Sequence, residues 1–169
     1  MSTFRPDDVI AVTDFEPQLA ALCPETARLL RDASLAVHPR VTAITLHGSR
    51  GPAGGYRPDS DVDLCLIVDT AGVTERAELA ALLRAVLDTT LAHWRGAVEA
   101  DLAAVYDRQG CGLSCFEQPA WDEVRCETGG QGCFGLYKIQ RGYDGFVAHG
   151  VELRKMFPCL VIWRKDTRD

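Results

Sequence analysis

Residues 46–69 read LHGSRGPAGGYRPDSDVDLCLIVD. An apolar run ends in a turn at Gly48 and Ser49, and a second apolar run begins with two carboxylates two positions apart, those of Asp61 and Asp63. Because side chains alternate between the two faces of a strand, Asp61 and Asp63 are expected to project from the same face. Two parallel carboxylates repel each other unless a cation lies between them. The pair therefore favours Mg²⁺, which prefers hard oxygen ligands and shares them with phosphates.

The sequence on either side of this stretch predicts alternating helices and strands. β-Branched residues and period-two alternation predict strands over Val41–His47, Val62–Asp69 and Val98–Tyr106. Helical spacing predicts helices over 16–22, over 24–37, and from an N-cap at Thr74 to near Gly96. From the first two helices, the residues expected to face the core are Leu19, Leu22, Leu29, Leu30 and Val37. The strand over Val62–Asp69 is apolar on both faces beyond its carboxylates, which indicates a sheet covered on both sides.

The order of the motifs, HGSRGPAGGYRPDSDVDL, resembles the nucleotidyltransferase superfamily that includes the kanamycin nucleotidyltransferases and the small bacterial minimal nucleotidyltransferases. The spacer between Ser49 and Asp61 is slightly longer than the family pattern and is rich in glycine. The resemblance covers roughly residues 40–105. It implies an α/β (α+β) fold with a mixed β-sheet and flanking helices.

The resemblance also implies a set of metal ligands. Asp61 and Asp63 would bind two Mg²⁺ ions, and a third carboxylate on a neighbouring strand would complete the site and serve as general base. Asp101 is the expected third carboxylate, since small alanines flank it. Glu99 lies on the same face of that strand and is the alternative.

The turn before the carboxylates is expected to bind phosphate. By the resemblance, Gly48 and Ser49 would hold the β- and γ-phosphates of a nucleotide. Arg50 is either a further phosphate contact or an exposed loop arginine. His47 is expected to orient the loop through a hydrogen bond, and a role as a base or a ligand is the alternative. Tyr137 and Lys138 are weaker candidates for reaching a base or a phosphate.

The implied reaction is Mg²⁺-dependent transfer of a nucleoside monophosphate from a nucleoside triphosphate, such as ATP, to a hydroxyl of a small molecule or protein. The alternative is a catalytically inactive module that keeps the fold to bind a nucleotide or a partner. No helical bundle is expected after the catalytic part of the chain, so a homodimer or a partner protein would cover the cleft, or the substrate would be open to solvent.

Composition narrows the partners. The net charge of −6 makes long nucleic acid an unlikely acceptor, because that affinity comes from Lys and Arg neutralising phosphates. No apolar run has the length of a bilayer span, and the first residues do not resemble a signal peptide. The expected location is therefore the cytoplasm, with no membrane partner.

The chain is expected to form one compact domain, with a core over 1–109 and a Cys/Gly-rich, irregular or β extension over 110–169 packed on it. Short apolar runs over Phe134–Ile139, Gly145–Leu153 and Pro158–Arg164 favour strands or a capping β-element. Four of the seven cysteines, Cys111, Cys115, Cys126 and Cys133, cluster among glycines. Their spacing does not match paired zinc-ribbon motifs, so reduced thiols are expected, with a structural Zn²⁺ site or a zinc-stabilised interaction domain as the alternative.

Overall fold

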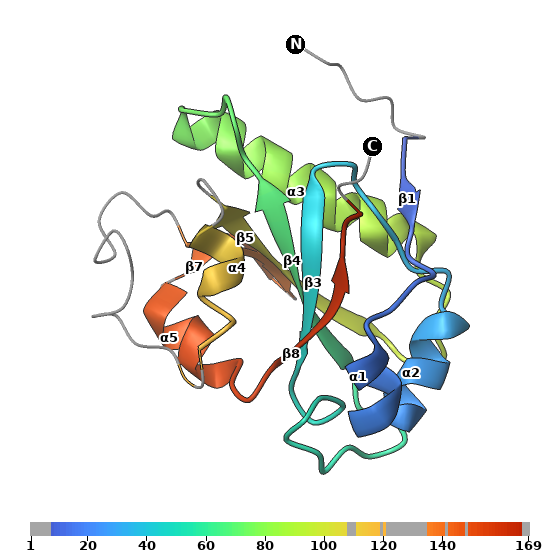
Figure 1. The fold of residues 1–169 in the computed structure, drawn as a ribbon. Coiled ribbons are helices and arrows are strands. Elements are labelled where there is room, and N and C mark those ends of the chain that lie inside the picture. The colour runs from blue at the N-terminus through green and yellow to red at the C-terminus, as the bar shows by residue number, and fades with distance from the viewer. Residues whose placement is uncertain are drawn as a thin grey trace.

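The computed structural model describes residues 8–107, 111–118, 120, 135–140, 142–147 and 149–166. Within these ranges the elements run, in chain order, β1 (Ile10–Ala11), α1 (Pro17–Leu22), α2 (Pro24–Arg31), β2 (Ala36–Val37), β3 (Val41–His47), β4 (Val62–Asp69), α3 (Arg76–His93), β5 (Ala100–Asp107), α4 (Cys111–Ser114), β6 (Leu136–Gln140), β7 (Tyr143–Val147), α5 (His149–Lys155) and β8 (Leu160–Arg164). Figure 1 shows their arrangement around a central sheet.

A six-stranded mixed sheet in the order β7-β6-β5-β4-β3-β8 forms the centre of the molecule. Strands β4 and β5 are parallel, and every other neighbouring pair in this sheet is antiparallel. A separate two-stranded sheet joins β1 to β2. The expected α+β fold, with a mixed sheet and flanking helices, is confirmed.

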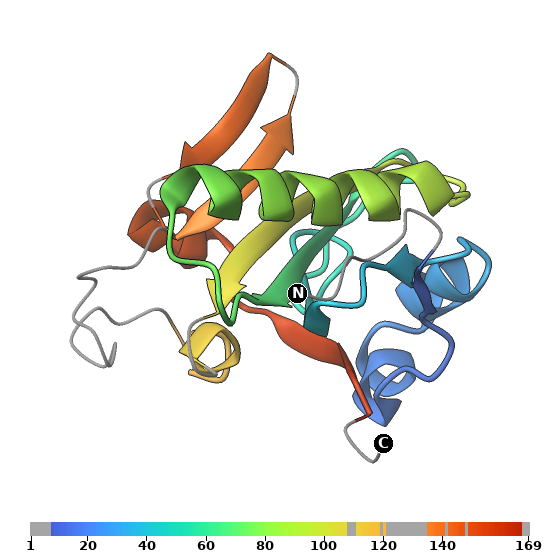
Figure 2. The same cartoon turned by 90° about the horizontal axis from the view of Figure 1, so that it is seen from above.

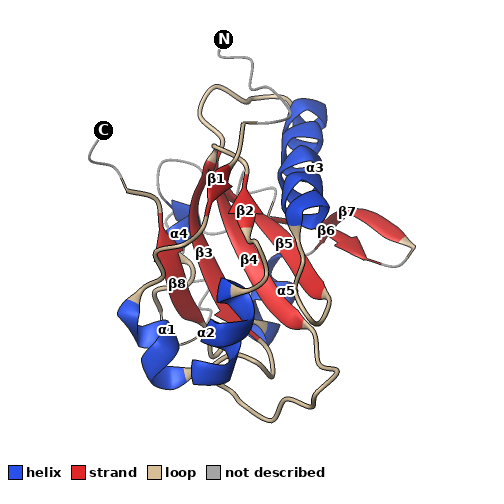
Figure 3. Cartoon of the chain, turned by 90° about the vertical axis from the view of Figure 1, so that its right-hand side faces the viewer, coloured by secondary structure: helices blue, strands red, loops and turns tan. Residues whose placement is uncertain are grey.

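Helices cover both faces of the sheet. Figure 3 looks onto the side where α1 and α2 lie, with α4 and α5 behind the strands. On the first side, the apolar stripe of α3 and the buried residues of α1 and α2 pack on alternate residues of β3, β4 and β5. On the second side, a smaller cluster joins the intervening residues of β4 and β5 to Phe116 and to Leu153 and Met156. The period-two assignment of β4 and β5 is confirmed, because Leu64 and Leu102 belong to the first cluster and Cys65 and Ala103 to the second.

The predicted strands 41–47 and 62–69 agree with β3 and β4, whereas the helix predicted over 24–37 is too long. Helix α2 ends at Arg31, and a turn with Ser34 at φ 55° leads into β2. A left-handed residue interrupts helical hydrogen bonding, so Val37 reaches the core from a strand. Leu22, expected in the core, is 63% exposed because it lies at the solvent side of a one-and-a-half-turn helix. The N-cap of α3 is Glu75 rather than Thr74.

The C-terminal part of the chain contributes to both edges of the central sheet. Strands β6 and β7 form a hairpin that extends the sheet beyond β5 and projects past α3 (Figure 2). Strand β8 pairs with β3 at the other edge. The run predicted as a strand over Gly145–Leu153 is divided, since α5 begins at His149, and Leu153 is buried from that helix. Across the described ranges, the helices are too short or too polar to span a membrane.

Candidate functional site

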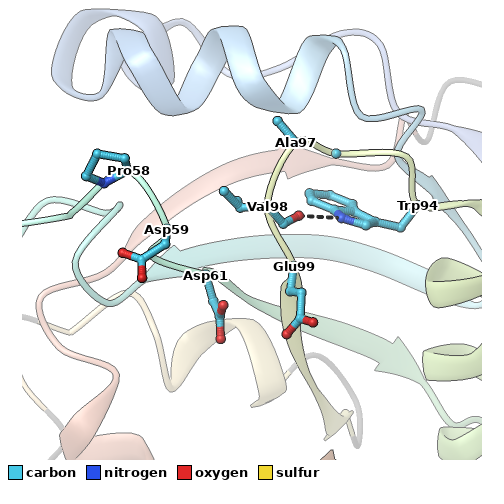
Figure 4. Close-up of a pocket in the computed structure, with 8 residues that line it drawn as sticks. Pro58, Asp59, Asp61, Trp94, Ala97, Val98 and Glu99 are labelled. Atoms are coloured by element: carbon cyan, nitrogen blue, oxygen red, sulfur yellow. Dashed lines mark hydrogen bonds between the residues drawn. The ribbon is translucent and has the colours of Figure 1, made fainter.

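Four carboxylates lie at the start of the two parallel strands. The register of β4 and β5 places Asp63 beside Asp101 and Val62 beside Ala100. The preceding pair, Asp61 and Glu99, therefore lies one step closer to the strand entry, where the Val62 N–H donates to the Glu99 carbonyl at 3.0 Å. Figure 4 shows the Asp61 and Glu99 side chains pointing the same way. Both expected third carboxylates, Asp101 and Glu99, thus share a face with the Asp-x-Asp pair.

Asp63 and Asp101 are the closest of these carboxylates. Burial, the charge of Asp101 and a hydrogen bond between the two carboxyls raise the pKa of Asp63 to about 7, and Asp61 adds to this effect. The Lys138 ammonium opposes the shift. Two like charges this close together favour a proton or a cation between them.

The Gly48 backbone lies directly against the Asp63 carboxylate. A Cβ on Gly48 would be 2.1 Å from Asp63 Oδ2, and its φ of +73° is in the left-handed region. Glycine is required at this position for both reasons. The Gly51 N–H donates to the Gly48 carbonyl at 3.0 Å and closes the turn, so the predicted phosphate-binding turn lies beside the predicted metal ligands.

Arg50 is buried, with 6% of its surface exposed, so the expectation of an exposed loop arginine is wrong. Its guanidinium donates to the carbonyl of Ser60 at 2.7 Å and to those of Arg57 and Pro58 at 3.2 Å. It also lies over the ring of Tyr56, 4.7 Å from the centroid. The planar guanidinium has several N–H donors, and with them Arg50 holds the spacer between Ser49 and Asp61 in a loop. Arg50 directly follows Ser49.

His47 lies beside Asp63 in the register of β3 and β4 and is buried. Burial lowers the pKa of His47 to about 4, although Asp101 and Glu152 favour its charged form, so the ring is neutral at pH 7. Within the described residues, its Nδ1 atom has no hydrogen-bond partner, and neither has the Thr45 hydroxyl two residues earlier on the same face. The hydrogen bond expected from His47 to the loop is thus absent at Nδ1.

Sequence reasoning missed Gln140. Its amide Nε2 donates to both oxygens of Asp101, at 3.3 and 3.2 Å, from the end of β6. Only the pairing of β6 with β5 reveals this contact, because nothing local marks a glutamine at the end of a hairpin strand as a carboxylate partner.

Two pockets adjoin the carboxylates. One of about 520 Å³ is lined by Asp61, Glu99, Ala100, Asp101, Ile139 and Gln140. The other, of about 730 Å³, is lined by Pro58, Asp59, Asp61, Trp94, Gly96, Ala97, Val98 and Glu99 (Figure 4). Asp61 and Glu99 line both. The indole of Trp94 is fixed in the wall, since its Nε1 donates to the Val98 carbonyl at 2.9 Å and its ring lies against Gly96.

Other candidates from the sequence lie elsewhere. Tyr137 is buried on the opposite face of β6 from Lys138, and its hydroxyl donates a hydrogen bond to the Asp144 carboxylate. Cys111 and Cys115 lie at α4, whereas Cys126 and Cys133 fall outside the described residues.

The donor set fits a hard divalent cation, because the site presents several carboxylates and the nearby Asp101 helps to raise the pKa of Asp63. In the described part of the chain, no three His, Cys, Asp or Glu side chains are already gathered closely enough to hold a metal ion. Asp61 is exposed at the site's edge. The Mg²⁺ and Zn²⁺ expectations both stay predictions.

Comparison with models of protein families and with curated protein sequences yields no significant match to this chain.

Proposed function

We propose that this protein is a Mg²⁺-dependent nucleotidyltransferase that moves a nucleoside monophosphate from a nucleoside triphosphate to a hydroxyl group. The observation that carries the proposal is the register of β4 and β5, which sets Asp63 beside Asp101 next to a turn whose glycine touches Asp63. Metal ligands and a phosphate-binding turn then share one face. The resemblance of the Gly-Ser and Asp-x-Asp motifs to that superfamily supports the same function.

In this proposal Asp61, Asp63 and Asp101 would hold two Mg²⁺ ions, which would neutralise charge on the phosphates and activate the attacking hydroxyl. Asp101 accepts the proton of that hydroxyl. Gln140 holds both Asp101 oxygens in position, which fixes the carboxylate before the substrate arrives. Gly48 and Ser49 bind the terminal phosphates, and Arg50 contributes by holding the loop that follows.

Each of the two pockets offers a separate route to the carboxylates. Both include Asp61 and Glu99, so a substrate in either one reaches the same side of the site. The larger pocket offers the flat, fixed indole of Trp94, and we assign the acceptor to it. The acceptor in this pocket would be either a small molecule or a protein. A homodimer or a partner protein would then cover the open side of the carboxylate site.

Calorimetric titration with ATP, GTP, CTP and UTP in Mg²⁺, repeated on Asp61→Asn plus Asp63→Asn, tests the proposal. The expected result is binding of at least one triphosphate that requires Mg²⁺ and that the double variant loses. Pyrophosphate release with the bound triphosphate and candidate acceptors then tests turnover.

Binding without turnover would favour the inactive nucleotide-binding module. Absence of binding to all four triphosphates by the folded protein would contradict the proposed function.

A further inference from the structure

Lys138 lies on the carboxylate face but has no place in the chemistry above. Its β6 position pairs with Ala103 of β5, two residues from Gln140 on the same face. Only 13% of its side chain is exposed. Its ammonium lowers the pKa values of both Asp63 and His47, so its charge is felt at the carboxylate site.

The Lys138 ammonium is loosely paired for a cation whose side chain is mostly buried. Its partner is Glu152 of α5, with Nζ 3.6 Å from Oε2, which is longer than a charge-assisted hydrogen bond. An ammonium carries three N–H donors, and within the described ranges no hydrogen bond engages them. Removing a charge from water costs free energy unless it is paired and hydrogen-bonded, so a mostly buried lysine with one long ion pair favours a further anionic partner.

Glu152 is shared between two lysines. Its other oxygen, Oε1, lies 3.6 Å from Nζ of Lys155, which is 68% exposed on α5. Glu152 therefore keeps a partner if Lys138 turns away from it. Two further buried polar atoms on this face have no partner among the described residues, the Thr45 hydroxyl and Nδ1 of His47. Unsatisfied polar groups beside a loosely paired cation favour a polar, anionic ligand.

We infer that Lys138 is an anion-binding residue, which Glu152 holds in the ligand-free protein and which exchanges Glu152 for a phosphate oxygen of the bound triphosphate. The inference rests on the proposed function and deepens it. Among the nearby cations, Arg50 is engaged by loop carbonyls, whereas the donors of Lys138 are available. The exchange keeps every charge paired, since Glu152 stays with Lys155.

Calorimetry with Mg²⁺-triphosphate and with Mg²⁺-pyrophosphate tests the exchange on the full chain. Lys138→Met is expected to weaken both affinities about ten- to a hundredfold, the range for losing a hydrogen bond to a charged group. Lys138→Arg keeps the charge and is expected to restore most of the affinity. Glu152→Gln is expected to tighten binding by a few fold, because the competing partner is weakened.

Arg154→Met is the matched control, because it removes an exposed basic residue of the same helix that pairs with Glu152 in neither ion pair. It is expected to leave the affinity within about twofold of the wild type. Thermal melts of all variants check that each one is folded.

Wild-type affinity in folded Lys138→Met would overturn the inference while leaving the proposed function intact. The same loss in Glu152→Gln as in Lys138→Met would also overturn it, because the ion pair would then act only by supporting the structure. If the wild type itself binds no triphosphate, the proposed function fails and this inference fails with it.

Discussion

The two faces of the central sheet are built from the same strands but carry different side chains. On the face under α1, α2 and α3, β4 contributes only apolar side chains, and Leu64 and Leu66 are fully buried. On the opposite face the same strand begins with a half-buried carboxylate at Asp63 and becomes apolar at Cys65 and Ile67. Because neighbouring residues of a strand point to opposite faces, β4 contributes core residues to one face and a carboxylate of the candidate site to the other.

The largest expected effect is on the carboxylate face. Asp101→Asn keeps the shape of the side chain but removes the charge that the proposed Mg²⁺ site uses, and transfer is expected to fall by at least about a thousandfold. Glu99→Gln, on the same face and strand, is the matched variant and is expected to cost much less. Rates of pyrophosphate release compare them. A larger loss in Glu99→Gln would reassign the third carboxylate to Glu99.

The next effect is on the apolar face of the sheet, which packs against α1, α2 and α3. Leu66→Ala removes a fully buried side chain from the larger core and is expected to cost about 2–5 kcal/mol of unfolding free energy. Denaturant titration measures this loss. Triphosphate affinity of the folded fraction is expected to stay unchanged, and a parallel loss of affinity would show that the two faces are not separable.

A glycine pair sharpens the contact between the turn and Asp63. Gly48 and Gly54 have φ values of +73° and +71°, but a Cβ would strike Asp63 only from Gly48 and meets nothing within 4 Å from Gly54. Gly54→Ala is expected to cost about 1–2 kcal/mol for left-handed backbone. Gly48→Ala is expected to cost about 1–3 kcal/mol more for the added overlap. Equal losses in thermal melts would mean that the Asp63 contact contributes nothing.

The last effect is on the pH dependence of stability without Mg²⁺. Since the pKa of Asp63 is raised to about 7 in the folded protein, the folded state binds a proton that the unfolded state has lost above about pH 4. Stability is therefore expected to decline as pH rises from about 4 to about 7 and then to level off. Melts in a chelator should show this decline in the wild type and a smaller one in Asp63→Asn. An identical profile in both would contradict the raised pKa of Asp63.

The sequence predicted well where the pattern is strong and local. Strands β3 and β4 have the predicted bounds, and the assignment of Asp63 and Leu64 to opposite faces holds, because period-two alternation needs no knowledge of the neighbours. It predicted poorly where the local signal is weak. The turn at Ser34 ends the helical region before the predicted bound. The predicted strand over Gly145–Leu153 contains the start of α5, and Leu153 of that helix is buried.

The sequence by itself determined that Asp61 and Asp63 share a face, that the Gly48 turn precedes them, and that apolar residues continue the strand into a core. These features depend on neighbours in the chain. Tertiary structure alone decided that Asp101 lies beside Asp63, that Gln140 and Lys138 come to them from β6, and that Arg50 is buried under its own loop. Strand register and helix docking depend on contacts far apart in sequence, and a local pattern carries no information about them.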